Sequence, residues 1–155
     1  MDTSSLVPLG QIQGEDASET SQLESMFREA AEYIESHHWA RPVAEAYMGI
    51  GIGGVLAVWL LRFAEKVGDD ADEYLWVING DLPSAYLVID QARDPVSALE
   101  VYCDLMVDWA QAVMEGKDPG EVFPVDAPTD GEHANMLLDR VRFIRERIIP
   151  GLGGD

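Results

Sequence analysis

The sequence predicts an α+β fold in which a short antiparallel sheet, a three-stranded meander, packs with about three helices. Two runs rich in aromatic and β-branched residues, 74–79 and 85–89, are typical of paired strands. Two strands alone are marginal in water, so a third strand over 55–63 is predicted to complete the sheet. Apolar residues recur at helical spacing in three further segments, near 19–38, 94–115 and 131–149.

Residues 1–18 carry no periodic apolar face, and they are predicted to form a flexible arm. A single domain is predicted over 19–150, followed by a flexible C-terminus over 151–155. The domain begins with an amphipathic helix for which Thr20 or Ser21 is the expected cap. The apolar face of this helix consists of Leu23, Met26, Phe27, Ala30 and Ile34.

An uncharged stretch of 16 residues between Glu45 and Arg62 raises the question of a membrane span. A helix needs about 20 apolar residues to cross a bilayer, so a buried element of a folded core is predicted instead. The four glycines of the stretch each disfavour helix, by about 1 kcal/mol relative to alanine. We therefore predict a central strand over 55–63, although a fully apolar run has no period that distinguishes strand from helix within 43–66.

The loop between the two clearest strands contains Gly80, Asp81, Leu82 and Pro83. Pro83 cannot donate to a strand ladder, so the loop is predicted to extend beyond a two-residue turn. It presents Leu82 beside a rigid proline, and the carboxylate of Asp81 is able to cap local backbone N–H groups. Asp81 and Leu82 are therefore binding candidates, with an internal lock of the sheet or a plain packed turn as the alternatives.

The helix predicted over 94–115 is the candidate for the centre of the core, because only a narrow polar stripe interrupts its apolar residues. Asp94 caps it and Gly116 ends it. The stripe includes Glu100, Asp104 and Asp108, whose like charges at four-residue steps disfavour the isolated helix by a few tenths of a kcal/mol per pair, as an order of magnitude. A basic partner, a bound cation or the arginine-rich last helix would offset this repulsion, and a solvated stripe is the alternative, so the three carboxylates are further binding candidates.

Charge excludes several classes of partner. The chain carries 29 Asp and Glu against 10 Lys and Arg, for a formal net charge of -19. Such a charge repels polyphosphate and anionic lipid, so neither nucleic acid nor a membrane is predicted as a partner. A basic protein, or a second copy of the chain in a homo-oligomer, remains. A cytoplasmic location is predicted, because no secretory signal is evident and the one cysteine, Cys103, cannot form an internal disulfide.

A metal-dependent hydrolase is the alternative function. Glu35 and His38 stand one helical turn apart, which is the spacing that di-iron bundles use twice, but the second copy is missing. A zinc site would need at least two of His37, His38 and His133 to converge with carboxylates. No nucleophile elbow or phosphate loop is present, so no cofactor and no catalytic residue are predicted.

Gly49, Gly51 and Gly54 match the dinucleotide-binding fingerprint by letter. The fingerprint functions only between a parallel strand and the start of a helix, and neither is indicated around these glycines. They are instead predicted to allow a close approach of the backbone or a bend into a strand.

Three parts of the sequence carry a family resemblance: Gly-Ile-Gly-Gly-Val-Leu-Ala-Val-Trp-Leu-Leu-Arg-Phe at 51–63, Leu-Trp-Val-Ile-Asn-Gly-Asp-Leu-Pro-Ser-Ala-Tyr-Leu at 75–87, and Ala98, Leu99, Tyr102 and Trp109. Over about residues 40–150 the chain resembles a set of small uncharacterised bacterial proteins in which the Gly-Asp-Leu-Pro turn recurs. That resemblance implies no activity, cofactor or site residue. In charge and size the chain also resembles the immunity proteins that neutralise bacterial toxins. We expect a non-enzymatic, acidic interaction protein that meets a basic partner or itself.

Overall fold

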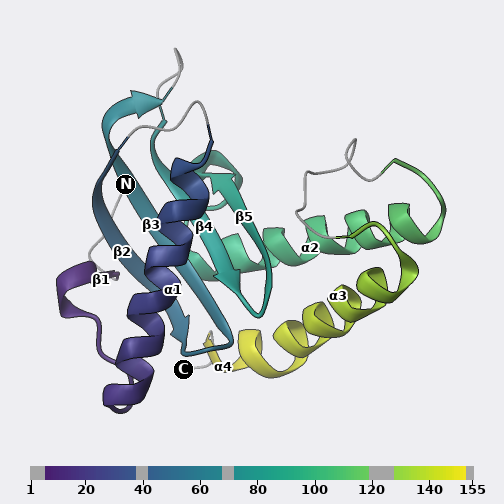
Figure 1. The fold of residues 1–155 in the computed structure, drawn as a ribbon, viewed down its shortest axis with the longest axis horizontal. Helices are drawn as coiled ribbons and strands as arrows, with labels where there is room; N and C mark the ends of the chain where they lie inside the picture. The colour runs from purple at the N-terminus through teal and green to yellow at the C-terminus, as the bar shows by residue number, and fades with distance from the viewer. Residues whose placement is uncertain (1–5, 38–41, 68–71, 119–127, 153–155) are drawn as a thin grey trace. The chain divides into compact units, whose positions relative to one another are not determined.

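The computed structural model describes residues 6–37, 42–67, 72–118 and 128–152. The chain divides into two compact units, Met1–Ala98 and Leu99–Asp155, and each is described by itself. The first unit holds a sheet and the helix α1, and the second holds most of α2 and the helices that follow (Figure 1). Among the described residues no helix is long and apolar enough to cross a membrane.

The sheet has five strands, so the predicted three-stranded sheet is wrong in its strand number. All neighbours pair antiparallel, and the strands follow one another in chain order. The three predicted strands are present and are joined by two more, one from the segment predicted as an arm and one from the glycine-rich stretch. The strands are β1 Val7–Pro8, β2 Val43–Ile52, β3 Leu56–Val67, β4 Asp72–Gly80 and β5 Leu82–Val88.

Strand β2 escaped prediction because its glycines and Glu45 interrupt the apolar pattern of a strand. Tertiary contacts explain why these residues occur in the strand. A Cβ added to Gly49 would lie 2.4 Å from Cγ of Pro95, so this strand position tolerates no side chain. Glu45 accepts a salt bridge from Arg62 on β3 at 3.0 Å, across the strand pair. Gly49 and Gly51 therefore lie in an antiparallel strand, as the close-approach interpretation requires and the dinucleotide fingerprint does not.

Strand β3 is central, as its uncharged run predicts, and its side chains from Leu56 to Leu61 are buried on both faces of the sheet. On one face Trp59 lies opposite Val77 and Leu61 lies opposite Leu75 on β4. On the other face Leu60 lies opposite Trp76, whose indole Nε1 donates a 2.9 Å hydrogen bond to the carbonyl of Ala92.

Helix α1, Ala17–Glu35, lies across the face of the sheet that carries Trp59 (Figure 1). Its N-cap is Asp16, which accepts the backbone N–H of Glu19 at 2.8 Å, and not the expected Thr20 or Ser21. The apolar side chains of the helix are buried against the sheet as predicted. They are Leu23, Met26, Ala30 and Ile34.

One buried polar side chain joins α1 to the sheet. Asn79 of β4 accepts a 2.9 Å hydrogen bond from Nε1 of Trp59, and its Nδ2 donates at 2.8 Å to the backbone carbonyl of Met26 in α1. The oxygen and the nitrogen of the Asn79 amide are therefore both hydrogen-bonded inside the core, where an unsatisfied polar group would lower the stability of the fold.

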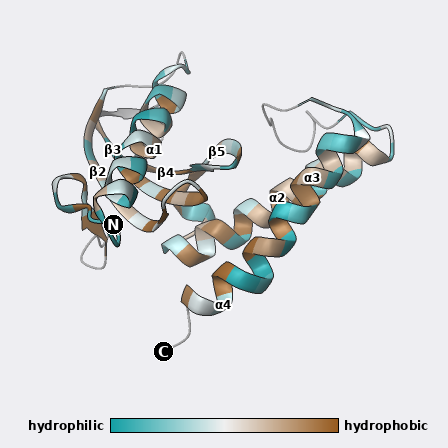
Figure 2. Ribbon diagram, turned by 60° about the horizontal axis from the view of Figure 1, so that its bottom comes forward, coloured by the Kyte–Doolittle hydropathy of each residue, from teal (hydrophilic) through white to brown (hydrophobic). Residues whose placement is uncertain are grey.

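In the second unit α2, Pro95–Met114, begins at the predicted cap, since Asp94 accepts the N–H of Ser97 at 2.7 Å. Helix α3, Gly131–Phe143, continues through a π-helical segment, η4 Ile144–Ile148, into α4, Ile149–Leu152. Figure 2 shows hydrophilic and hydrophobic residues alternating along α3, as expected for an amphipathic helix. Trp109 and Cys103 of α2 are buried.

Candidate functional site

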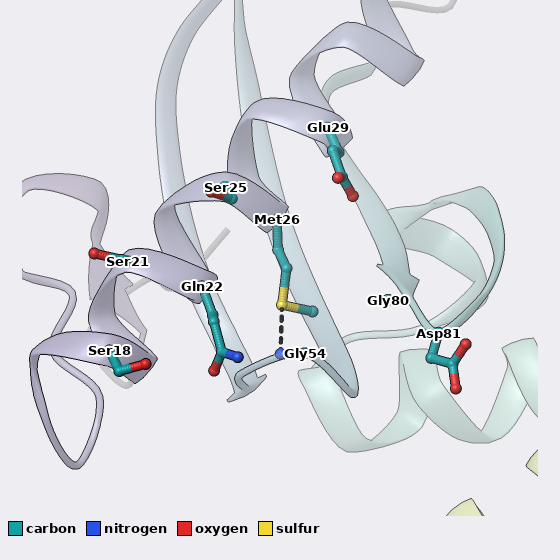
Figure 3. A pocket seen from close by; sticks show the side chains of 9 residues that line it. All are labelled: Ser18, Ser21, Gln22, Ser25, Met26, Glu29, Gly54, Gly80 and Asp81. Atoms are coloured by element: carbon teal, nitrogen blue, oxygen red, sulfur yellow. Dashed lines mark hydrogen bonds between the residues drawn. The ribbon is translucent and has the colours of Figure 1, made fainter.

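A pocket of about 650 Å³ in the first unit could bind a ligand, and we call it the turn pocket (Figure 3). One wall is the N-terminal half of α1, and the other comes from two turns, β2–β3 and β4–β5. Its nine lining residues are Ser18, Ser21, Gln22, Ser25, Met26, Glu29, Gly54, Gly80 and Asp81.

The helical wall is a polar stripe. Ser18, Gln22, Ser25 and Glu29 follow one another at three- and four-residue steps, so they lie along one side of α1. The apolar residues of the helix, which point into the core, fix the rotation that turns this stripe to the pocket. Hydroxyl, amide and carboxylate groups thus stand in a row within reach of one ligand.

The β2–β3 turn is tied to the helix by two contacts of its backbone. The N–H of Gly53 donates to Oε2 of Glu19 at 3.2 Å, and the N–H of Gly54 points at the sulfur of Met26 at 3.4 Å. Figure 3 shows Met26 reaching from α1 to Gly54. Gly54 has a φ of 76°, a left-handed conformation that glycine adopts without strain. The turn is therefore held in place from its side facing the helix.

The β4–β5 turn is held by the β2–β3 turn. The N–H of Asp81 donates to the carbonyl of Val55 at 2.9 Å. Gly80 has a φ of 141°, and a Cβ built on it would lie 2.3 Å from the same Val55 oxygen. Only glycine fits there, so the two turns form one wall with Asp81 at its rim.

This turn differs from its prediction. Strand β4 ends at Gly80 and β5 begins at Leu82, so Asp81 alone separates them and the loop is shorter than predicted. Pro83 does not lengthen the loop because β5 is an edge strand of the sheet, where a residue without an N–H is tolerated. Asp81 is exposed and lines the turn pocket, whereas Leu82 is partly buried and is not among the lining residues.

The charge of the turn pocket has one sign. Glu29 and Asp81 contribute carboxylates, and none of the nine described lining residues is Lys, Arg or His. Serine hydroxyls and the Gln22 amide add hydrogen-bond acceptors. Such a set suits an ammonium or guanidinium group, since charge-assisted hydrogen bonds to carboxylates are stronger than neutral ones.

Sequence reasoning found Asp81 but missed the helical wall. In the sequence the solvated face of an amphipathic helix would look the same as this set of serines, Ser18, Ser21 and Ser25. The one feature that could have indicated a site is that three serines occupy positions that a surface helix usually fills with charged residues.

The acidic candidates on α2 lie in the other unit and are exposed. Asp104 forms a salt bridge with Arg145 of η4 at 2.5 Å, and the arginine-rich last helix was one of the three alternatives that could offset the repulsion. Glu100 and Asp108 flank it on the same side of the helix. The stripe is therefore partly neutralised within its own unit.

The candidate metal ligands that the structure describes, His37, His133 and Glu35, are not brought together. Nδ1 of His37 donates to the carbonyl of Tyr33 at 2.9 Å, at the end of α1, and its ring packs edge-on against Tyr33 and Tyr86. His133 donates to Asp130, the N-cap of α3, and this contact lowers the pKa of the carboxyl. Glu35 is exposed at the last position of α1, and His38 lies outside the described residues. Within the described ranges, no three His, Cys, Asp or Glu residues are grouped to hold a metal ion.

Cys103 is a free, buried thiol in α2. Burial raises the pKa of its thiol to about 11, against a weaker opposing effect of Arg145. A thiol that stays protonated at neutral pH is a poor nucleophile, so Cys103 is a core side chain.

Comparisons of the chain with family models, with curated proteins and with solved structures find no match.

Proposed function

We propose that this chain is a non-enzymatic, acidic binding protein whose turn pocket receives a lysine or arginine side chain of a basic protein partner. The observation that carries the proposal is a pocket lined by two carboxylates and by no cation among its nine described residues, in a chain with a formal net charge of -19. The charge draws a basic partner from a distance, and the pocket selects the side chain on contact.

Rigidity of the wall supports the proposal. The Asp81 backbone is tied to Val55, and the β2–β3 turn is tied to α1 through Glu19 and Met26. A preformed site loses little conformational entropy when a flexible lysine or arginine enters, so affinity is retained. The resemblance in charge and size to toxin-neutralising immunity proteins agrees with a basic protein partner but adds no residue to the site.

Titration with a lysine-containing peptide at about 0.15 M salt, where the Debye length is about 8 Å, tests the proposal. The double variant Glu29→Gln, Asp81→Asn removes both pocket carboxylates, and we expect it to weaken binding by about tenfold or more. The matched control, Glu35→Gln with Asp90→Asn, removes the same charge at two exposed positions outside the pocket. It should change the affinity by less than about twofold, because exposed charges are screened. Equal weakening by both variants would leave only a general attraction between charges and would refute the pocket.

No described residue favours the metal-dependent hydrolase, since His37 and His133 are each engaged at a helix end. The acidic binding protein is therefore the function proposed.

A further inference from the structure

A second, smaller pocket lies on the other flank of the same helical segment. It has a volume of about 430 Å³, and we call it the leucine pocket. Ser21 and Ser25 line both pockets, so this part of α1 is a wall that the two pockets share. The lining of the leucine pocket is Leu9, Gly10, Ser21, Glu24, Ser25, Phe27 and Arg28.

The leucine pocket is lined by two large apolar side chains, Leu9 and Phe27. Leu9 is a large apolar side chain that remains 38% exposed, in a 3-10 turn of residues Leu9–Gln11 that follows β1. Phe27 also lines the pocket, and its ring packs edge-on against Trp59 with the ring centres 5.4 Å apart. An exposed leucine and an aromatic ring in one pocket lining form a surface on which an apolar side chain gains by burial.

Charge separates the roles of the two pockets. Arg28 donates from Nη2 to the hydroxyl of Ser25 at 3.1 Å, which places a guanidinium at the leucine pocket. Glu24 also lines this pocket, so its two opposite charges offset each other, whereas the carboxylates of Glu29 and Asp81 attract a cationic side chain to the turn pocket. A ligand with one cationic and one apolar side chain is therefore favoured in one orientation across the helix.

We infer that the two pockets form one recognition surface for a peptide segment of the basic partner, with a lysine or arginine in the turn pocket and an apolar side chain in the leucine pocket. This inference rests on the proposed function and adds the sequence that the partner must present. An α-helix is about 10 Å wide and an extended chain advances about 3.3 Å per residue, so the two anchors should stand about three residues apart.

Synthetic peptides test this spacing with the full-length protein. One peptide carries a lysine and a leucine three positions apart in a Gly-Ser background, a second replaces the leucine by glycine, and a third moves the leucine six positions further. We expect the first to bind about tenfold more tightly than the second, because burial of a leucine side chain is worth about that factor. The third should lose most of this gain.

The variant Leu9→Ser tests whether the tighter binding of the leucine-containing peptide comes from the leucine pocket. It should abolish the advantage of the leucine peptide while leaving the lysine-only peptide unaffected, and a thermal melt checks that the fold persists after a change at a partly exposed position. As a second readout, the backbone amide NMR signal of Gly10 should move with the first peptide and not with the second.

Two failures are distinguishable. If the leucine brings no gain, or if the gain survives in Leu9→Ser, the two-pocket surface is refuted, while a lysine effect that depends on Glu29 and Asp81 would still support the proposed function. If the lysine effect itself is absent, the proposed function falls and the inference falls with it.

Discussion

The indole Nε1 of Trp59 donates a 2.9 Å hydrogen bond to Oδ1 of Asn79, and both side chains are buried. The amide also reaches the carbonyl of Met26 in α1, so one residue joins the helical wall of the turn pocket to the sheet behind it. The sulfur of the same Met26 faces the N–H of Gly54. The position of the pocket wall thus depends on a polar contact deep in the core.

Replacing Asn79 by alanine should lower the free energy of unfolding by about 1–3 kcal/mol, because it leaves the Trp59 N–H unsatisfied in the core and removes the hydrogen bond that the amide donates to the Met26 carbonyl. Urea denaturation measures the change. The exposed Asn135→Ala serves as control and should stay within about 0.5 kcal/mol of wild type. In a double-mutant cycle with Trp59→Phe the two losses should not add, and full additivity would contradict the pairing.

Gly80→Ala should destabilise the first unit by about 3 kcal/mol or more, since the new methyl group would meet the backbone oxygen of Val55 at a left-handed φ. Gly54→Ala also has a positive φ but more space around it, and about 1 kcal/mol is expected. Gly10→Ala, with open space around its Cβ position, should be almost neutral. Thermal melts of the three variants should follow this order, and similar losses at Gly80 and Gly10 would contradict the tight joining of the turns.

Trp109→Ala should cost about 3–5 kcal/mol, because the indole is buried in α2 and its removal leaves a large cavity. Met114→Ala on the same helix provides the control, since that side chain is 54% exposed. Urea denaturation compares the two variants. A loss below about 1 kcal/mol for Trp109→Ala would show that the core of the second unit is misplaced.

Cys103 should resist thiol reagents in the folded protein. Its pKa of about 11 keeps the thiol protonated at pH 8, so labelling should be at least about a hundredfold slower than in the urea-unfolded chain. The sign of the linkage follows from the same shift. Because the folded pKa lies above the ordinary value of 9.0, the unfolded chain loses the proton first, and rising pH above that value favours unfolding. Rapid labelling of the native protein at pH 8 would contradict the burial of the thiol.

Residues whose neighbours in sequence determine their environment were predictable. The uncharged run around Trp59 led to the central strand, and the Asp94-Pro95 pair led to the start of α2. Strand β2 was not predicted because the residues that interrupt its pattern contact residues far away in the sequence. Gly49 leaves room for the ring of Pro95, and Glu45 forms a salt bridge with Arg62. A local sequence pattern does not show such contacts.

The candidate site was half predictable for the same reason. Asp81 was predicted as a binding candidate because it follows Gly80 in an unusual turn. Ser18 and Ser25 become pocket residues only because the two hairpin turns lie next to α1, which the sequence pattern does not show. That approach depends on Val55, Met26 and Asn79, which are far apart in sequence.

The most direct test of the account is to map the binding of the lysine-containing peptide by NMR on the ¹⁵N-labelled protein. The turn pocket predicts that amide signals of residues 18–29, 53–55 and 80–82 shift together and saturate at one affinity, and that the double variant Glu29→Gln, Asp81→Asn loses these shifts. Shifts that instead gather around Glu100, Asp104 and Asp108, or that spread over every acidic surface without saturation, would contradict the account.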